Sequence, residues 1–488
     1  MLSRNRRRLL QFIAVPASVV VGLASTLVPA SAATLVQLST DPYTNKTSQH
    51  ATEVEPDTYA FGSTIVSVFQ VGRFFDGGAS NIGFATSTDG GSSWTNGLFP
   101  SSTVFASPAG KYARGSDASV AYDPKHGVWM ASWLGVVNPS GPVDVVVTRS
   151  TDGGLSWGAP VTVNATGHFD DKNWTVCDTT ASSAFYGNCY TEFDDASLGD
   201  LEQMSTSTDG GLTWGAALPT RNKVHGIGGQ PLVQPNGTVV VPFERFRGNN
   251  SSIGAFTSSD GGGSWGPAVT VAPIFFRPAA GGLRESPLPS AELDSSGKVY
   301  VVWTDCRFEP KCSASDLVLS TSTDGVNWTD PARIPADTVG SGVDHFIPGI
   351  AVDRSTSGNT THIVLTYYYY PVAACTSSTC QLDVGYTSST NGGATWSAGT
   401  QVAGPMSLGW LANTSQGTMV GDYISTSFSG AVAYPAFAVA SAPSVGVFNE
   451  TTDTVSGGVV ASGGLLTASG QSSSQTSSGL GVGTRTSQ

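Results

Sequence analysis

The sequence predicts an all-β chain built from repeated four-stranded antiparallel sheets. The octapeptide STDGGSSW at residue 87 returns as STDGGLSW at 150, STDGGLTW at 207, SSDGGGSW at 258, STDGVNW at 322 and STNGGATW at 389. Short β-branched runs such as DVVVTRSTDGG and DLVLSTSTDGV lead into these boxes, and helical periodicity is absent. The repeats start 51 to 67 residues apart. Each therefore has room for four strands with their turns, which is the blade of a β-propeller.

Each octapeptide is predicted to form a hairpin turn. The paired glycines supply the positive φ that a tight turn needs. The hydroxyl and the carboxylate accept backbone N–H groups across the turn, and the tryptophan packs against a neighbouring sheet. The five equivalent acids, with Asn391 in the sixth box, have no asymmetric chemical task, so we expect the boxes to be structural.

The boxes resemble the Asp-box, or BNR, repeats of the sialidase (neuraminidase) superfamily and of other propellers. The resemblance covers about Thr34 to Val455. It implies that each box joins the third and fourth strands of a blade, on the face away from the substrate. It also implies a secreted, sialidase-like glycoside hydrolase that acts on extracellular glycans. Asp boxes occur in propellers that only bind as well, so the alternative is a non-catalytic glycan- or protein-binding propeller that uses the same rim.

The number of blades follows from a second repeat. A polar or proline-bearing cluster opens each predicted first strand: EPDTY at 55, GSDAS at 115, DKNW at 171, GGQPL at 228, RESPLPS at 284, HFIPG at 345 and GDYIS at 421. These seven openings favour seven blades, of which the last lacks a box. TLVQLST at 34 resembles strands that follow boxes and is predicted to supply the missing outer strand, which removes an exposed edge. Characterised sialidases have six blades, so six blades with an extra strand pair is the alternative.

The ends of the chain are predicted to lie outside the propeller. Four arginines between residues 4 and 8 precede an apolar run to residue 28 and the small residues Ala30, Ser31 and Ala32, the pattern of a secretory signal peptide over 1–32. The pattern leaves Sec and twin-arginine export both open. The propeller is assigned to 33–455. Residues 456–488 are rich in Gly and Ser and are predicted to be disordered.

The charge balance bears on partners. The net charge of -13 becomes -17 once residues 1–32, with four arginines and no acid, are removed. Nucleic acid is therefore not expected as the partner, because phosphate binding needs a basic surface. We expect a secreted monomer that binds an extracellular glycan or glycoconjugate, without membrane attachment after cleavage of the signal.

The six cysteines form three close pairs: Cys177 with Cys189, Cys306 with Cys312, and Cys375 with Cys380. In an exported chain such spacing predicts local disulfides. A metal centre would need thiols and histidines at ligand spacing, and the six histidines do not supply it. No metal and no cofactor is expected.

One rim of the propeller is expected to carry the chemistry. The loops that enter the first strands and the loops between second and third strands emerge on one face, and polar side chains gather there although only 12% of all residues are charged. Acids, arginines and aromatics together suit a sugar ligand. The catalytic candidates are Arg284, Glu285, Asp422 and Tyr423. The substrate-binding candidates are Glu55, Asp57, Arg73, Asp171, Gln230, Arg245, Arg307 and His345.

The resemblance gives these residues possible roles. A sialidase uses three arginines for the substrate carboxylate, a tyrosine nucleophile with a glutamate beside it, and an aspartate as acid and base. Arg73, Arg245, Arg284 and Arg307 are available for the carboxylate, and Tyr423 for the nucleophile. The Arg-Ile-Pro signature of the family is missing ahead of the first box. The most similar stretch, FFRP at residue 275, lies before the fifth box of this numbering.

Overall fold

The structure is a computed structural model that describes residues 33–248 and 250–470. The predicted signal peptide lies outside the described residues. The described part is all-β, with short 3₁₀ turns as its helical elements: η1 (Ala196–Leu198), η2 (Ala280–Gly282), η3 (Pro310–Cys312), η4 (Gly358–Thr360) and η5 (Leu408–Trp410). None of the described helices is long and apolar enough to cross a membrane.

Seven antiparallel runs of strands follow one another along the described chain. The first three runs are β2 (Glu53–Phe61), β3 (Thr64–Arg73), β4 (Ala79–Ser87) and β5 (Thr95–Leu98); β6 (Arg114–Asp123), β7 (Val128–Val136), β8 (Val143–Ser150) and β9 (Val161–Asn164); and β10 (Asp170–Cys177), β11 (Cys189–Asp195), β12 (Leu201–Ser207) and β13 (Leu218–Pro219). A single pair, Ala79 with Gly115, joins the first two runs into one sheet.

The other four runs repeat the same order. They are β14 (Gly226–Ile227) and β15 (Leu232–Val233) with β16 (Val239–Arg247), β17 (Asn250–Ser258) and β18 (Val269–Pro273); β19 (Ser290–Leu293), β20 (Val299–Asp305), β21 (Asp316–Ser322) and β22 (Ala332–Arg333); β23 (Asp344–Val352), β24 (Ile363–Tyr370), β25 (Gln381–Ser389) and β27 (Thr400–Ser407); and β30 (Ser425–Ser429), β31 (Val432–Ala440), β32 (Glu450–Val455) and β1 (Leu35–Gln37). Beside them, β28 (Ala412–Thr414) and β29 (Gly417–Met419) form a hairpin.

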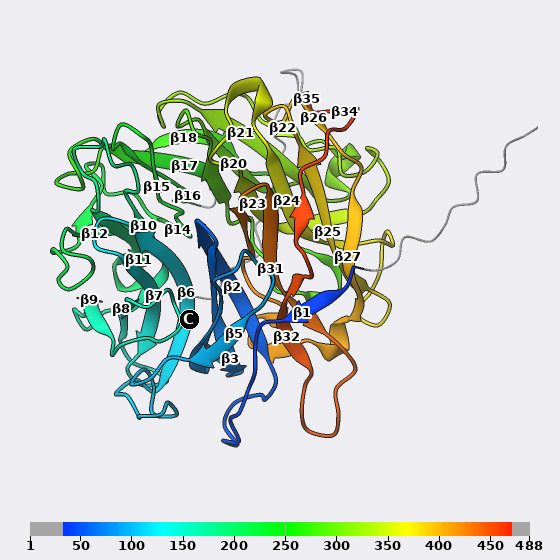
Figure 1. Ribbon diagram of the computed structural model, residues 1–488. Helices are drawn as coiled ribbons and strands as arrows, with labels where there is room; N and C mark the ends of the chain where they lie inside the picture. Colours follow the sequence, from blue (N-terminus) through cyan, green and yellow to red (C-terminus); the bar gives the residue numbers. More distant parts are fainter. Residues whose placement is uncertain (1–32, 249, 471–488) are drawn as a thin grey trace, which may run out of the picture. The chain divides into compact units, whose positions relative to one another are not determined.

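The first strands of these runs contact one another in chain order. β2 contacts β6, β6 contacts β10, β10 contacts β15, and the series continues through β19 and β23 to β30, which contacts β2 again. In Figure 1 the colours pass in order from sheet to sheet, and β1, in blue, lies beside β32, in red. The predicted pairing of the N-terminal segment is confirmed, because Leu35 to Gln37 lie opposite Asp453 to Val455.

Apolar side chains fill the space between consecutive sheets. In one such cluster, Phe84 of the first run and Trp133 of the second are both buried, and Trp157 of the second box packs on Phe84 and Phe99. Similar clusters lie between the later runs. The strands are therefore buried on both faces, which explains their nearly continuous apolar runs.

The boxes are turns between third and fourth strands, as predicted. In the first box the Ser87 hydroxyl accepts the Gly91 N–H at 2.8 Å, and Asp89 Oδ1 accepts the Ser93 N–H at 2.9 Å. Gly90 and Gly91 have φ of 70° and 83°. In an antiparallel run the end of the third strand and the start of the first lie at opposite ends of the sheet. The boxes are thus remote from the openings of the first strands.

Replacing Asp152 by alanine in the second box is expected to lower the free energy of unfolding by about 1 kcal/mol, the scale of lost turn hydrogen bonds. Its Oδ1 accepts the N–H groups of Leu155 and Ser156 at 3.2 and 3.0 Å. Denaturant unfolding measures the change. Asp330→Ala is the control, because Asp330 is exposed and has no side-chain hydrogen bond to the described residues. Equal stability of the two variants would contradict the structural role of the boxes.

The predictions of the disulfides and of a disordered C-terminal tail have different outcomes. The three predicted disulfides are present, Cys177–Cys189, Cys306–Cys312 and Cys375–Cys380, which fits an extracellular protein. The predicted disorder from residue 456 does not hold for the described part of the tail. There β33 (Val459–Val460) pairs with β31, β34 (Leu466–Thr467) with β26 (Thr395–Trp396), and β35 (Ser469–Gly470) with β22. Backbone pairing offsets the ordering entropy that side chains of this composition cannot.

Candidate functional site

Four first strands, β2, β6, β10 and β23, carry the same irregularity near their start, and in the first three of them an ionisable residue occupies it. β2, β6 and β10 each contain a β-bulge, and its first residue is left-handed: Glu55 with φ of 55°, Asp117 with 44° and Lys172 with 46°. A bulge re-aims a side chain, and a left-handed non-glycine residue costs on the order of 1–3 kcal/mol. The three ionisable side chains meet as a result.

Lys172 lies at the centre of this meeting point. Its Nζ is 2.8 Å from Asp117 Oδ1, 2.7 Å from Asp422 Oδ2 and 3.5 Å from Glu55 Oε1. Arg284 forms two hydrogen bonds with the same Asp422: its Nε donates to Oδ1 at 2.8 Å, and its Nη2 donates to Oδ2. We call the following group the central cluster: Glu55, Arg73, Asp117, Asp171, Lys172, Arg284, Asp422 and Tyr423.

Arg73 joins the cluster through Gln70. Its Nη1 donates to Gln70 Oε1 at 3.0 Å, and Gln70 Nε2 donates to Glu55. Burial lowers the pKa of Arg73, and the charge of Arg284 adds to that effect. Arg73 Nε and Arg284 Nη1 are buried without a hydrogen-bond partner among the described residues. Two guanidinium groups of the central cluster therefore have N–H donors that no described residue accepts.

The acids of the cluster have unequal proton affinities. Burial raises the pKa of Glu55 to about 7, although Lys172 opposes the shift. Burial, followed by the charge of Asp117, raises the pKa of Asp171 to about 6. Burial acts in the same direction on Asp422, but Arg284 and Lys172 outweigh it and hold the pKa of that carboxyl well below its usual range. Near neutral pH, Asp422 is ionised while Glu55 can exchange a proton.

Tyr423 places a phenol beside these acids. The side chain is 7% exposed, and its hydroxyl is buried with no hydrogen-bond partner among the described residues. The ring meets Trp174 edge-on at 5.1 Å, and Lys172 Nζ lies 5.4 Å from its centroid. Burial, followed by the charge of Glu55, raises the pKa of Tyr423 well above its ordinary value. A small pocket adjoins the ring and is lined by Lys172, Asn173, Trp174, Gly228, Gln230, Leu288, Pro289 and Tyr423.

Of the twelve residues proposed from the sequence, the structure brings six together in the central cluster: Glu55, Arg73, Asp171, Arg284, Asp422 and Tyr423. Asp57 and Gln230 instead tie neighbouring first strands together. Asp57 Oδ2 accepts the Val120 N–H, and Gln230 Oε1 accepts the Ala291 N–H, both at 2.8 Å.

Four candidates have partners elsewhere. Glu285 Oε1 accepts the Ala279 N–H at 2.9 Å, and burial raises the pKa of its carboxyl to about 8. Arg245 reaches Ala268 and Thr270, beside the outer strand of its sheet. Arg307 forms a fork with Asp305, with its Nε 2.9 Å and its Nη2 2.7 Å from the carboxylate. His345 lies with Asp316 and Asp337.

Two members of the cluster, Asp117 and Lys172, were not among the proposed site residues. Each is the first residue of the bulge in its strand, as Glu55 is in β2. Asp117 lies two residues before Ser119, Lys172 two residues before Trp174, and Glu55 two residues before Asp57. Asp117 and Lys172 lie in the polar openings GSDAS at 115 and DKNW at 171, which the sequence places on the rim, but neither was selected as a site residue.

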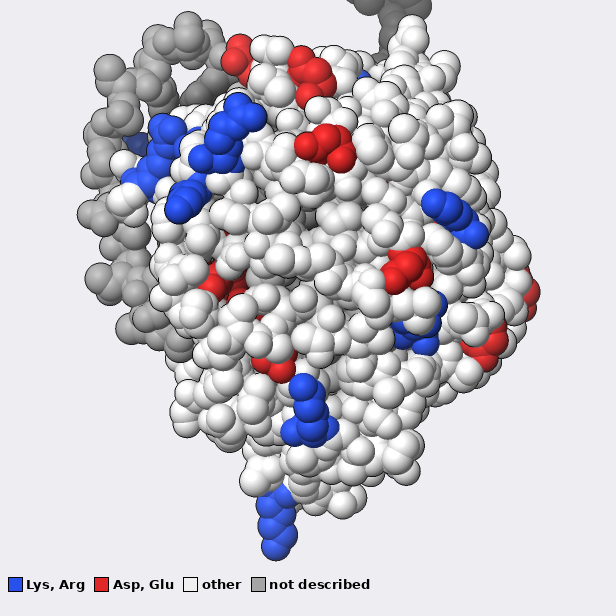
Figure 2. Space-filling model, turned by 90° about the vertical axis from the view of Figure 1, so that its left-hand side faces the viewer, with Lys and Arg blue, Asp and Glu red and all other residues white. Residues whose placement is uncertain are grey.

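A second acid group lies on β11 and β12. Glu192 and Asp194 share one face of β11, Glu202 lies opposite Asp194, and all three are fully buried. Neither Asp194 oxygen has a hydrogen-bond partner among the described residues. Burial raises the pKa of Glu202 to about 8 and those of Glu192 and Asp194 well above their usual range. On the face drawn in Figure 2, by contrast, charged side chains form small groups separated by uncharged surface.

Comparisons with known proteins give distant structural likenesses. No family model matches, and no curated protein matches. Among solved structures, a protein of unknown function from Dyadobacter fermentans has 16% identity and a TM-score of 0.45, covering 73% of this chain and 98% of its own. A Hadza microbial sialidase has 13% identity and a TM-score of 0.46, and the match covers 77% of this chain and 74% of the sialidase. An ulvan lyase has 11% identity and a TM-score of 0.48, and the match covers 86% of this chain and 96% of the lyase.

Proposed function

We propose that this chain is a secreted, sialidase-like glycoside hydrolase that acts on extracellular glycans, built as a seven-bladed β-propeller. Seven runs of strands, the contact of β30 with β2 and the pairing of β1 with β32 support the closed, seven-bladed arrangement. The signal-peptide pattern and three disulfides support export.

The observation that carries the enzymatic proposal is the Tyr423 hydroxyl, which is buried without a hydrogen-bond partner among the described residues and lies beside Glu55, whose pKa burial raises to about 7. A buried phenol normally finds a hydrogen bond. One left without a partner stabilises the fold little, and its position suits a reacting group instead.

The cluster can divide the steps of glycoside cleavage. Ionised Glu55 takes the phenolic proton while Tyr423 Oη forms a bond to the anomeric carbon and the glycosidic C–O bond breaks. Asp171, half-buried and with a pKa of about 6, gives a proton to the leaving oxygen. Asp422 stays ionised and stabilises the positive charge of an oxocarbenium-like transition state. The unpartnered N–H groups of Arg73 and Arg284 attract an anionic sugar substituent.

Replacing Tyr423 by phenylalanine tests this assignment, because it removes one oxygen that has no hydrogen-bond partner among the described residues. On a panel of chromogenic glycosides that includes sialosides and uronides, we expect turnover of the cleaved substrate to fall by about a hundredfold or more. The melting temperature should stay equal or rise. Tyr122→Phe, far along β6 from the bulge, is the matched control and should keep full turnover.

Full turnover of the Tyr423 variant would overturn the assignment. The alternative, a non-catalytic binding propeller, is favoured by the ion pairs that already occupy Lys172 and Arg284. It predicts no hydrolysis by the wild type, together with glycan-array binding that the Tyr423 variant weakens.

A further inference from the structure

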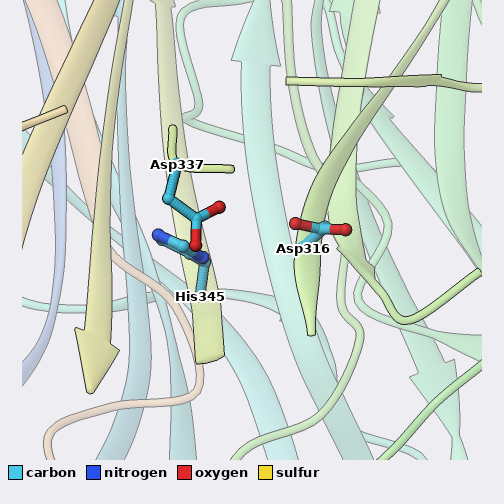
Figure 3. A group of neighbouring side chains, drawn as sticks. All are labelled: Asp316, Asp337 and His345. Atoms are coloured by element: carbon cyan, nitrogen blue, oxygen red, sulfur yellow. The ribbon is translucent and has the colours of Figure 1, made fainter. Parts of the chain in front are cut away.

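Asp316, Asp337 and His345 form a separate group between the fifth and sixth runs. Asp316 begins β21, His345 is the second residue of β23, and Asp337 lies in the segment between β22 and β23. One ligand atom from each lies within 4.8 Å of the other two. Figure 3 shows the Asp337 carboxylate beside the imidazole, with Asp316 to their right on a strand of another sheet.

Two atoms of this group have unused bonding capacity. His345 Nδ1 and Asp316 Oδ2 are buried without a hydrogen-bond partner among the described residues. The residues His345 and Asp316 are only 3% and 2% exposed. Orphaned buried polar atoms are uncommon and point to a partner that protein atoms do not supply.

The surroundings hold the three side chains in place. Arg333 Nε donates to Asp316 Oδ1 at 2.8 Å, which fixes that carboxylate through one oxygen. Arg333 Nη2 donates to Asp337 Oδ1 and the Ser341 hydroxyl donates to Asp337 Oδ2, so Asp337 is held through both oxygens. The His345 ring stacks on Tyr369 at 5.9 Å and meets Tyr367 edge-on at 5.4 Å. Fixing ligands through their other atoms is what outer partners do in metal sites.

The local charge favours a dication. Asp316, Asp337 and nearby Glu309 carry three negative charges when ionised, against the single positive charge of Arg333. The net charge of -2 matches a divalent cation. A single imidazole with two carboxylates suits Zn²⁺, whereas Ca²⁺ and Mg²⁺ prefer all-oxygen sites.

We propose that Asp316, Asp337 and His345 bind one Zn²⁺ ion, with a water completing the coordination. The ion would join β21 to β23 and so cross-link two successive sheets. This proposal concerns different residues from the central cluster and does not depend on it.

Metal titration of the untagged full chain tests the site. After EDTA treatment and buffer exchange, calorimetry with ZnCl₂ should give one high-affinity site per chain, and the melting temperature should rise by several degrees. MgCl₂ at the same concentration should give no shift. His345→Gln should weaken zinc binding by at least about tenfold and remove the thermal shift. His126→Gln, which changes a histidine paired with Asp123 in another sheet, should bind as the wild type does.

Asp337→Asn provides an independent check, since Asp337 is only partly buried and the amide is isosteric. A melt before zinc addition shows that each variant is folded. The proposal is overturned if the wild type binds no stoichiometric zinc, or if neither the His345 nor the Asp337 variant binds more weakly. Equal binding of Mg²⁺ would overturn the assignment of the ion.

Discussion

Lys172→Met is expected to lower the free energy of unfolding by about 3–5 kcal/mol, the scale for removing one partner of a buried ion pair. The Lys172 side chain is 7% exposed and contacts three carboxylates. Methionine keeps the length of the side chain but leaves Asp117 and Glu55 without their cation. Urea unfolding followed by fluorescence measures the loss.

Two further variants isolate the electrostatic cause of this loss. Lys111→Met should change stability by less than about 0.5 kcal/mol, because exposed ion pairs contribute little. Lys111 is 67% exposed and lies 3.6 Å from Asp144. Adding Asp117→Asn to Lys172→Met should recover part of the loss, since one uncompensated carboxylate is removed. If Lys172→Met is as stable as the wild type, the ion pairs of the cluster do not stabilise the fold.

The protein is expected to be more stable at pH 5 than at pH 8. Burial raises the pKa values of Glu53, Glu202 and Glu285 to about 8 in the folded state, from a usual value of 4.5. Between these values the unfolded chain has lost the protons that the folded chain still holds. Each such group therefore reduces the unfolding free energy by up to about 1.4 kcal/mol per pH unit across this window.

Thermal melts from pH 5 to pH 8 measure this trend. Glu202→Gln should reduce the slope and raise the melting temperature at pH 8, since a neutral amide loses no proton. At pH 5, where the carboxyl is protonated in the folded state, the variant should resemble the wild type. The Asp-box acids do not affect this window, because their hydrogen bonds lower their pKa values, to about 2 in Asp152 and Asp324. A melting temperature that rises from pH 5 to pH 8 would contradict the prediction.

The sequence was most informative where the chemistry is local. The boxes and the disulfides each depend on a few adjacent residues, and both were predictable. The strand at Leu35 pairs with a distant segment, and it was predictable because its sequence resembles that of the strands that follow boxes. The tail beyond residue 456 was not, because its strands are ordered by backbone pairing with β22, β26 and β31 rather than by side chains that a composition reveals.

The candidate site was predictable in part. The openings of the first strands led to the end of the sheets at which the central cluster lies, but the bulges decide which side chain turns inward. In β23 the left-handed bulge position is Ile347, with φ of 50°, so His345 precedes it and faces another group.

Among the strand pairings of the described residues, that of β1 with β32 joins the segments farthest apart in the sequence. Residues 35–37 must wait for residues 453–455, so during synthesis every earlier sheet can form while the seventh sheet stays incomplete. Until then the outer edge of β32 offers unpaired N–H and C=O groups to any other strand. Residues 35–37 thus cover the outer edge of β32. Their loss would expose this edge, at which two molecules could exchange strands.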